Sequence, residues 1–256
     1  MVTVADILAF VETLAPRSMK MDWDNVGLLC GSRRTPVTKV LIALDPFEGV
    51  CAEAESWDAQ LIVTHHPIIF QPLKSVTDET SIGRSIQRLC RSGIGAVNAH
   101  TNLDCAPGGV NDILAAKLGL TDVEVIQPEG EHLLRMGLVK EQPLDCFLAT
   151  VKESLGCAGI CYVDGGKPVR KVAVGGGACA GGMMDAYLAG CDTFVTSDIK
   201  YNQFWDAFDL GMNLIDAGHF PTENPVIAYL AEKIAAAFPG VEVKISETHR
   251  DCMKYF

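Results

Sequence analysis

Three stretches of the chain place histidine and carboxylate side chains directly after apolar runs. Ligands of open α/β proteins bind at the carboxyl ends of the strands, so polar residues that follow such runs are candidates for chemistry. The stretches and their candidate residues are LIVTHHPIIF (61–70) with His65 and His66, NAHTNLD (98–104) with His100 and Asp104, and DAGHFPTEN (216–224) with His219 and Glu223.

Each stretch taken alone also has a purely structural interpretation. Adjacent histidines on a strand point to opposite faces, Asp104 is placed to cap a following helix, and Glu223 is placed to favour the positive end of a helix dipole. The joint pattern favours chemistry, because four of the six histidines fall in these three stretches beside carboxylates.

Imidazoles and carboxylates together suit a borderline divalent cation such as Zn, Fe, Mn or Ni. When one carboxylate bridges, five such ligands are enough for two ions about 3.5 to 4 Å apart. Such a pair activates water and holds a substrate oxygen. The residues therefore predict a site for two divalent cations and favour a hydrolase.

Short β-branched runs alternate with helical ones along most of the chain. This alternation predicts an α/β fold with largely parallel sheets covered by helices on both faces. Strands are expected at 40–44, 61–64, 94–99, 171–176, 193–196 and 212–216, and helices at 3–15, 47–57, 81–90, 109–119, 181–190 and 202–211.

The stretch 121–172 departs from this alternation, with strands expected at 133–140 and 160–164 around a helix at 143–155. We therefore predict two packed lobes. The first comprises 1–125 and 213–256 and carries most of the metal ligands, and the second comprises 126–212.

The charge and the cysteines limit the classes of partner. The 256 residues include 21 Lys and Arg against 32 Asp and Glu, which gives a net charge of −11. This charge argues against general electrostatic binding of nucleic acid, and only a local basic pocket stays open as a binding site. No apolar run approaches the ~18 residues of a membrane span, and Asp6 and Glu12 interrupt the place of a signal peptide. We expect a cytoplasmic protein without a membrane partner, and its ten cysteines are expected to be free thiols.

Five strings of the chain resemble the NIF-three-like family, whose bacterial members are often called type 2 GTP cyclohydrolase I proteins. The likeness extends from about residue 22 to 230 and keeps the family's order. The strings are DWDNVGLLCG, THHPIIFQPLKS, NAHTNLD, GGGACAGGMMDAYLAGCDTFVTSDIKY and DLGMNLIDAGHFPTEN.

The resemblance implies a fold of two intertwined α/β lobes with the metal site between them, without the extra domain that longer relatives insert. It implies that His66 and Asp104 hold one ion, that His65 and His219 hold the other, and that Glu223 bridges both. His100 matches a histidine of the same cavity and is expected to act as a base or to orient another group. The resemblance also implies a homohexamer and a small-molecule substrate similar to GTP.

Some positions depart from the family or stay ambiguous. Asn202 stands where many relatives have histidine, and residues 246–256 match no family ending. The glycine-rich stretch VAVGGGACAGG (172–182) either cradles a phosphate or makes a tight turn. Asp45, Asn25, Lys74 and Lys200 each have a functional and a structural interpretation, and for the lysines a solvated surface is favoured.

The sequence favours a metal-dependent hydrolase in which activated water attacks an electrophilic carbon or phosphorus. Two alternatives stay open. One is an oligomeric metal-binding scaffold or regulatory protein without turnover, and the other is a metal-dependent phosphoesterase acting on nucleotides or nucleic acid.

Overall fold

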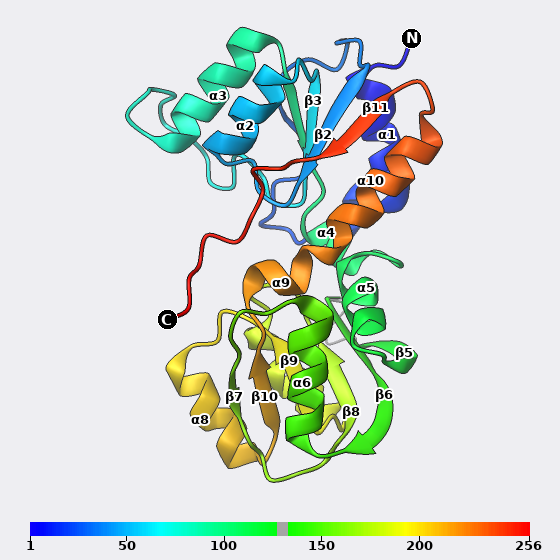
Figure 1. Ribbon diagram of the computed structural model, residues 1–256, viewed down its shortest axis with the longest axis vertical. Coiled ribbons are helices and arrows are strands. Elements are labelled where there is room, and N and C mark those ends of the chain that lie inside the picture. The colour runs from blue at the N-terminus through cyan, green and yellow to red at the C-terminus, as the bar shows by residue number, and fades with distance from the viewer. Residues whose placement is uncertain (127–132) are drawn as a thin grey trace. The chain divides into compact units, whose positions relative to one another are not determined.

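The computed structural model describes residues 1–126 and 133–256, which form two compact units. The first unit comprises Met1–Ala106 and Val226–Arg250, and the second comprises Pro107–Pro225 and Asp251–Phe256. Each unit is an α/β structure built on one sheet (Figure 1). The predicted fold class is therefore confirmed. Within the described ranges, no helix is both long enough and apolar enough to cross a bilayer.

The first unit is a three-layer structure around a five-stranded sheet in the order β1-β4-β3-β2-β11. Its strands are β1 (Gly27–Cys30), β2 (Lys39–Ala43), β3 (Leu61–Thr64), β4 (Gly95–Asn98) and β11 (Glu242–Ile245). Its helices are α1 (Val4–Leu14), α2 (Glu48–Ser56), α3 (Ser81–Ser92), α4 (Thr101–Cys105) and α10 (Pro225–Ala237), with a 3-10 turn at Arg17–Met19.

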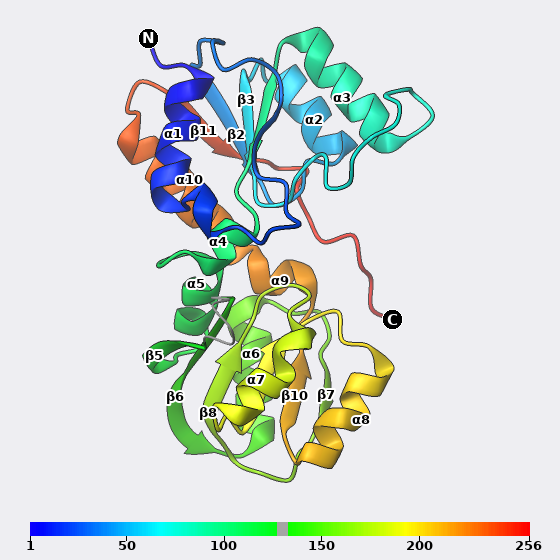
Figure 2. The same cartoon turned by 180° about the vertical axis from the view of Figure 1, so that it is seen from behind.

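The central strands β11, β2, β3 and β4 run parallel, and β1 joins antiparallel to β4 at the edge. Helices α2 and α3 cover one face of this sheet, and α1 and α10 cover the other (Figures 1 and 2). Side chains alternate accordingly, since Leu41 and Ile62 pack with Val50 and Leu89 in the core beneath α2 and α3. The parallel strands end at a common edge, where the candidate histidines follow.

The second unit contains a six-stranded sheet in the order β5-β6-β8-β9-β10-β7. Its strands are β5 (Thr121–Ile126), β6 (Leu134–Gln142), β7 (Cys161–Val163), β8 (Val169–Val174), β9 (Thr193–Thr196) and β10 (Asn213–Asp216). Its helices are α5 (Val110–Lys117), α6 (Leu144–Leu155), α7 (Met183–Leu188), α8 (Tyr201–Leu210) and α9 (His219–Glu223), with a 3-10 turn at Ala180–Gly182.

Parallel pairing is confined to the centre of this sheet, where β8, β9 and β10 lie side by side. The pairings of β5, β6 and β7 are antiparallel, so the sheet is mixed rather than largely parallel. Val172 and Val174 face a core with Phe147 of α6, whereas Ala173 between them faces a core with Ala186 of α7. Helices therefore cover both faces here too.

The division of the chain differs from the predicted lobes. Residues 107–125, 213–225 and 251–256, which we expected in the first lobe, belong to the second unit. For the first two ranges the reason is strand pairing, because β5 pairs with β6, and β10 pairs with β9 and β7. Local patterns do not reveal these partners. Strands β1, β5 and β11 were also missed, whereas every predicted strand and helix is present within a few residues of its expected bounds.

Candidate metal centre

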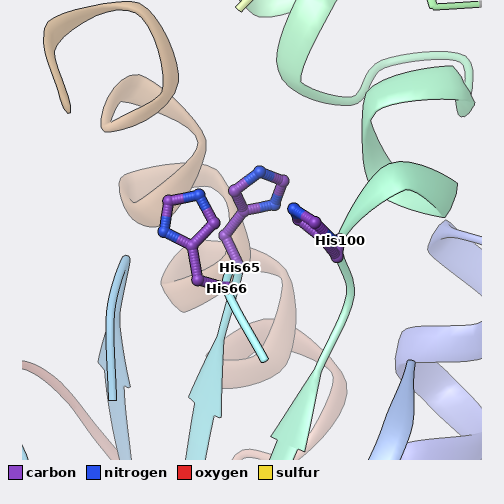
Figure 3. A group of neighbouring side chains, drawn as sticks. All are labelled: His65, His66 and His100. Carbon is purple, nitrogen blue, oxygen red and sulfur yellow. The ribbon is translucent and has the colours of Figure 1, made fainter. Parts of the chain in front are cut away.

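The ends of β3 and β4 bring three imidazoles together in the first unit (Figure 3). Because Thr64 pairs with Asn98 in the parallel register, the residues that follow the two strands emerge side by side. The ring centroid of His65 lies 4.9 Å from that of His66 and 5.2 Å from that of His100. One nitrogen of each ring lies within 4.8 Å of one nitrogen of each of the others, so the three rings could share a cation.

The Nδ1 atoms of His65 and His66 face oxygen acceptors. His65 is fully buried, and its Nδ1 lies 2.9 Å from the carbonyl oxygen of Ala99. A carbonyl oxygen can only accept, so this nitrogen is the donor and Nε2 carries the lone pair. Nδ1 of His66 lies 2.7 Å from Oδ1 of Asp45, which follows β2. Asp45 thus holds a histidine of the cluster, and the interpretation as a plain turn residue is insufficient.

His100 is held by a buried carboxylate. Its Nδ1 lies 2.8 Å from Oδ1 of Asp24, whose Oδ2 accepts the backbone N–H of Thr101 at 3.0 Å and also its hydroxyl. Burial opposes ionisation of Asp24, but the hydrogen bonds from His100 and Thr101 outweigh it and lower the pKa of Asp24 to about 2. An ionised carboxylate is an acceptor, so His100 donates from Nδ1, and in the neutral ring the lone pair is on Nε2.

Asp104 lies inside the short helix α4, with its side chain buried. Its Oδ1 lies 3.5 Å from Nε2 of His65. Asn102 of the same helix fixes this turn, because its Oδ1 accepts the backbone N–H of His100 and its Nδ2 donates to the carbonyl oxygen of Ala15 at 2.7 Å. Asp104 therefore faces the imidazole cluster and is not an N-cap.

In the second unit, His219 and Glu223 lie one turn apart on α9. Nε2 of His219 is 3.0 Å from Oε2 of Glu223, whose side chain is 5% exposed. Nδ1 of His219 lies 2.8 Å from Oδ2 of Asp198, which follows β9. The pattern of the first unit is repeated: an oxygen holds Nδ1, and Nε2 faces a carboxylate.

The glycine-rich loop after β8 makes room for this pair. Gly177 has a φ of +62°, and a Cβ at this position would overlap Oε1 of Glu223 and lie 3.1 Å from Nε2 of His219. The loop is fixed by a hydrogen bond from the Gly177 N–H to Oγ1 of Thr222 at 3.0 Å and by one from the Ser197 hydroxyl to the Gly177 carbonyl at 2.7 Å. The described contacts of Gly177 are thus those of a tight turn that accommodates a carboxylate.

The other residues singled out in the sequence join loops or lie exposed on the surface. Asn25 donates from Nδ2 to the Ile69 carbonyl at 2.7 Å and so joins two loops of the first unit. Asn202, Lys74 and Lys200 are exposed. All ten cysteines lie in the described part of the chain and are free thiols, as predicted.

Two residues of the site were not identified from the sequence. Asp24 lies 76 residues before the histidine that it holds, and Asp198 lies 21 residues before His219. Each stands in a string that carries the family resemblance, DWDNVG and TSDIKY. Those strings were the available signal, although the carboxylate within them had no assigned partner.

The protein consists of two α/β units, and in each unit an imidazole Nε2 atom faces a carboxylate. It is therefore an α/β protein with candidate metal-binding groups in both units. The family described as Duf34/NIF3 (NGG1p interacting factor 3) matches residues 2–252. The chain therefore belongs to this family.

Similar proteins cover the whole chain. A Clostridium perfringens protein named "GTP cyclohydrolase 1 type 2 homolog" is 34% identical, with 98% of each chain covered. The crystal structure of a Bacillus cereus protein related to NIF3 superposes with a TM-score of 0.93 at 26% identity, covering 100% of this chain and 99% of the other. A Staphylococcus aureus protein gives a TM-score of 0.91 at 27% identity, with 100% and 99% covered.

Proposed function

We propose that the chain binds two divalent cations and acts as a metal-dependent hydrolase. One observation carries this proposal. In each of the four candidate histidines, Nδ1 forms a hydrogen bond with an oxygen atom. Metal-binding histidines are oriented in this way, because the bond at one nitrogen fixes the tautomer and raises the basicity of the other.

The donor set fits the ions that we propose. Imidazole nitrogen and carboxylate oxygen suit Zn, Fe, Mn or Ni, and Gly177 leaves the space that the Glu223 carboxylate needs. From the family resemblance, we assign His66 and Asp104 to one ion, His65 and His219 to the other, and Glu223 to both.

When bound, the ions would supply Lewis acidity and make water a better nucleophile. His100 has the geometry of a general base within the same cluster. Its Nε2 lone pair can take a proton from the attacking water, and the imidazolium that forms would be stabilised by ionised Asp24 at Nδ1. The buried carboxylate therefore fixes both the tautomer and the direction of proton transfer.

The names of the relatives support a substrate similar to GTP. For such a substrate, we propose that the attacked atom is the purine ring carbon that is released as formate. The resemblance also supports a homohexamer, which analytical ultracentrifugation of the purified protein tests. Ten free thiols suit a reducing compartment, and we propose the cytoplasm.

Elemental analysis of Glu223→Ala tests the metal proposal, on protein purified without chelator or nickel affinity resin. Wild type should contain two ions per chain and Glu223→Ala close to none. Glu232→Ala, on the exposed side of α10, is the matched control and should keep both ions. Stoichiometric metal in Glu223→Ala would contradict the bridge.

Activity separates the candidate functions. The metal-loaded protein is incubated with GTP, cyclic dinucleotides and short single strands of nucleic acid. Formate release from GTP supports the cyclohydrolase. Release of phosphate or nucleotide indicates a phosphoesterase, and inertness toward every substrate indicates a scaffold.

A further inference from the structure

Two exposed aromatic rings stand beside His100 in the first unit. Trp23 is 61% exposed and Phe70 is 46% exposed. Their ring centroids lie 5.8 Å apart in an edge-to-face arrangement. The His100 ring is 6.3 Å from Trp23 and 6.0 Å from Phe70, again edge to face. The aromatic pair, Trp23 and Phe70, is therefore continuous with the imidazole cluster.

The loop that carries Trp23 is fixed on both sides of this residue. Lys20 donates from Nζ to the carbonyl oxygens of Met21 at 3.0 Å and Asp22 at 3.3 Å. Asp24, the next residue, accepts hydrogen bonds from His100 and Thr101. The exposure of Trp23 is thus a property of an ordered loop whose backbone position is set by the candidate site itself.

The loop that carries Phe70 is tied to the same place. Nδ2 of Asn25 donates to the carbonyl oxygen of Ile69 at 2.7 Å, and Nδ2 of Asn98 donates to the carbonyl oxygen of Asn25 at 3.1 Å. These bonds join the Trp23 loop to the Phe70 loop and to the end of β4. The separation between the two rings is therefore set by backbone contacts rather than by the rings alone.

Large aromatic side chains are mostly buried in folded proteins, because burial of so much apolar surface is favourable. Trp23 and Phe70 stay exposed on a fixed backbone beside the imidazole of His100, which is proposed to be catalytic. They therefore offer π-faces to a ligand without a cost for ordering the loop. A planar heteroaromatic ring is the ligand that such faces bind best, because stacking requires only a flat π-system.

We infer that Trp23 and Phe70 hold the planar ring of the substrate and so place its reacting atom beside Nε2 of His100. This inference rests on the proposed function and deepens it. The ring contacts select for a heteroaromatic substrate, whereas the metal ligands and His100 act on the atom that is attacked. Trp23 and Phe70 are therefore substrate-positioning residues.

Isothermal titration of the purified protein with guanosine 5′-monophosphate tests the inference, with ribose 5-phosphate as the probe that lacks the ring. Trp23→Leu and Phe70→Leu should each weaken binding of the nucleotide by about tenfold, the magnitude expected for loss of one stacking contact. Binding of ribose 5-phosphate should be the same in wild type and variants. Trp205→Leu, which removes a tryptophan that is 54% exposed on α8 of the second unit, should bind the nucleotide as wild type does.

Metal content measured on the same samples separates this inference from the proposed function. Two ions per chain together with equal nucleotide affinity in wild type and Trp23→Leu would overturn the inference and leave the metal proposal standing. Ring-dependent binding by a wild type that contains no metal would support the inference and overturn the metal proposal. Sedimentation that changes in Trp23→Leu while nucleotide affinity does not would assign the rings to contacts between copies, which also overturns it.

Discussion

In both units a carboxylate orients a candidate histidine, but the two carboxylates differ in how deeply they are buried. In the first unit, His100 is held by Asp24, whose side chain is fully buried, and in the second unit His219 is held by Asp198, whose side chain is 51% exposed. The carboxylates that face Nε2 do not differ in this way, since Asp104 on α4 and Glu223 on α9 are both buried. The two units thus differ in the carboxylate that orients the histidine, which is buried in the first unit and exposed in the second.

The burial of the orienting carboxylate determines how much it contributes to stability. A buried carboxylate with several donors fixes an imidazole and also contributes to folding stability, because its charged form is stabilised only in the folded state. An exposed carboxylate orients its histidine in competition with water and contributes little to stability. Substitutions in the two units should therefore separate stability from metal binding.

Among substitutions that keep the proposed ligands themselves, Gly177→Ala in the second unit should have the largest effect on metal binding. The added methyl group would overlap Oε1 of Glu223, and because that carboxylate ends a flexible side chain, it should move rather than the backbone. The left-handed φ adds about 1 to 2 kcal/mol of strain. Elemental analysis should show that more than half of the bound metal is lost.

Gly156→Ala is the matched control for this substitution. Gly156 also has a left-handed φ, +67°, but no atom lies within 4 Å of a Cβ built there. It should show similar strain and full metal content. If both variants lose metal equally, the glycine loop does not position Glu223.

Of the two orienting carboxylates, Asp24 and Asp198, the buried Asp24 should have the larger effect on stability when it is replaced by Asn. Folding lowers the pKa of Asp24 from 3.8 to about 2, which corresponds to about 2 kcal/mol. A carboxyl group with a lowered folded-state pKa stabilises the protein fully above its unfolded pKa, and this contribution is lost as the pH falls toward 2. The variant should therefore be less stable than wild type by about 2 kcal/mol at pH 7, with the gap closing between pH 4 and pH 2.

Thermal unfolding followed by circular dichroism across this pH range measures the gap. Asp22→Asn, two residues earlier and exposed, should unfold as wild type does. A gap for Asp24→Asn that is constant from pH 7 to pH 2 would contradict a role for the ionised carboxylate.

The sequence predicted the candidate histidines that lie together better than the groups that orient them. His65, His66 and His100 follow apolar runs that only strands explain, so the shared edge of a parallel sheet implied that they meet. Asp24 could not be assigned in the same way, because its partner is set by the antiparallel pairing of β1 with β4, and β1 was not recognised.

The fold was predictable to a similar extent. Elements with a strong apolar pattern, such as the helix at 81–90 and the strand at 61–64, were found, whereas the edge strands β5 and β11 were not. Edge strands have few buried side chains, and β5 is exposed from Thr121 to Val125, so its sequence lacks the apolar pattern by which strands are recognised. The misplacement of residues 107–125 follows from that omission.

Asp198→Asn should have the smallest effect on stability, and it tests directly whether burial of the orienting carboxylate distinguishes the two units. Its carboxylate is half exposed and orients His219 through one hydrogen bond, so its loss should change the free energy of unfolding by less than about 0.5 kcal/mol. Metal affinity should nevertheless fall roughly tenfold, the lower end of the range for an orienting partner of a ligand. Competition with a chromogenic chelator measures the affinity, and Asp209→Asn on the exposed side of α8 is the control. If Asp198→Asn destabilises the fold as much as Asp24→Asn does, burial of the orienting carboxylate does not distinguish the two units.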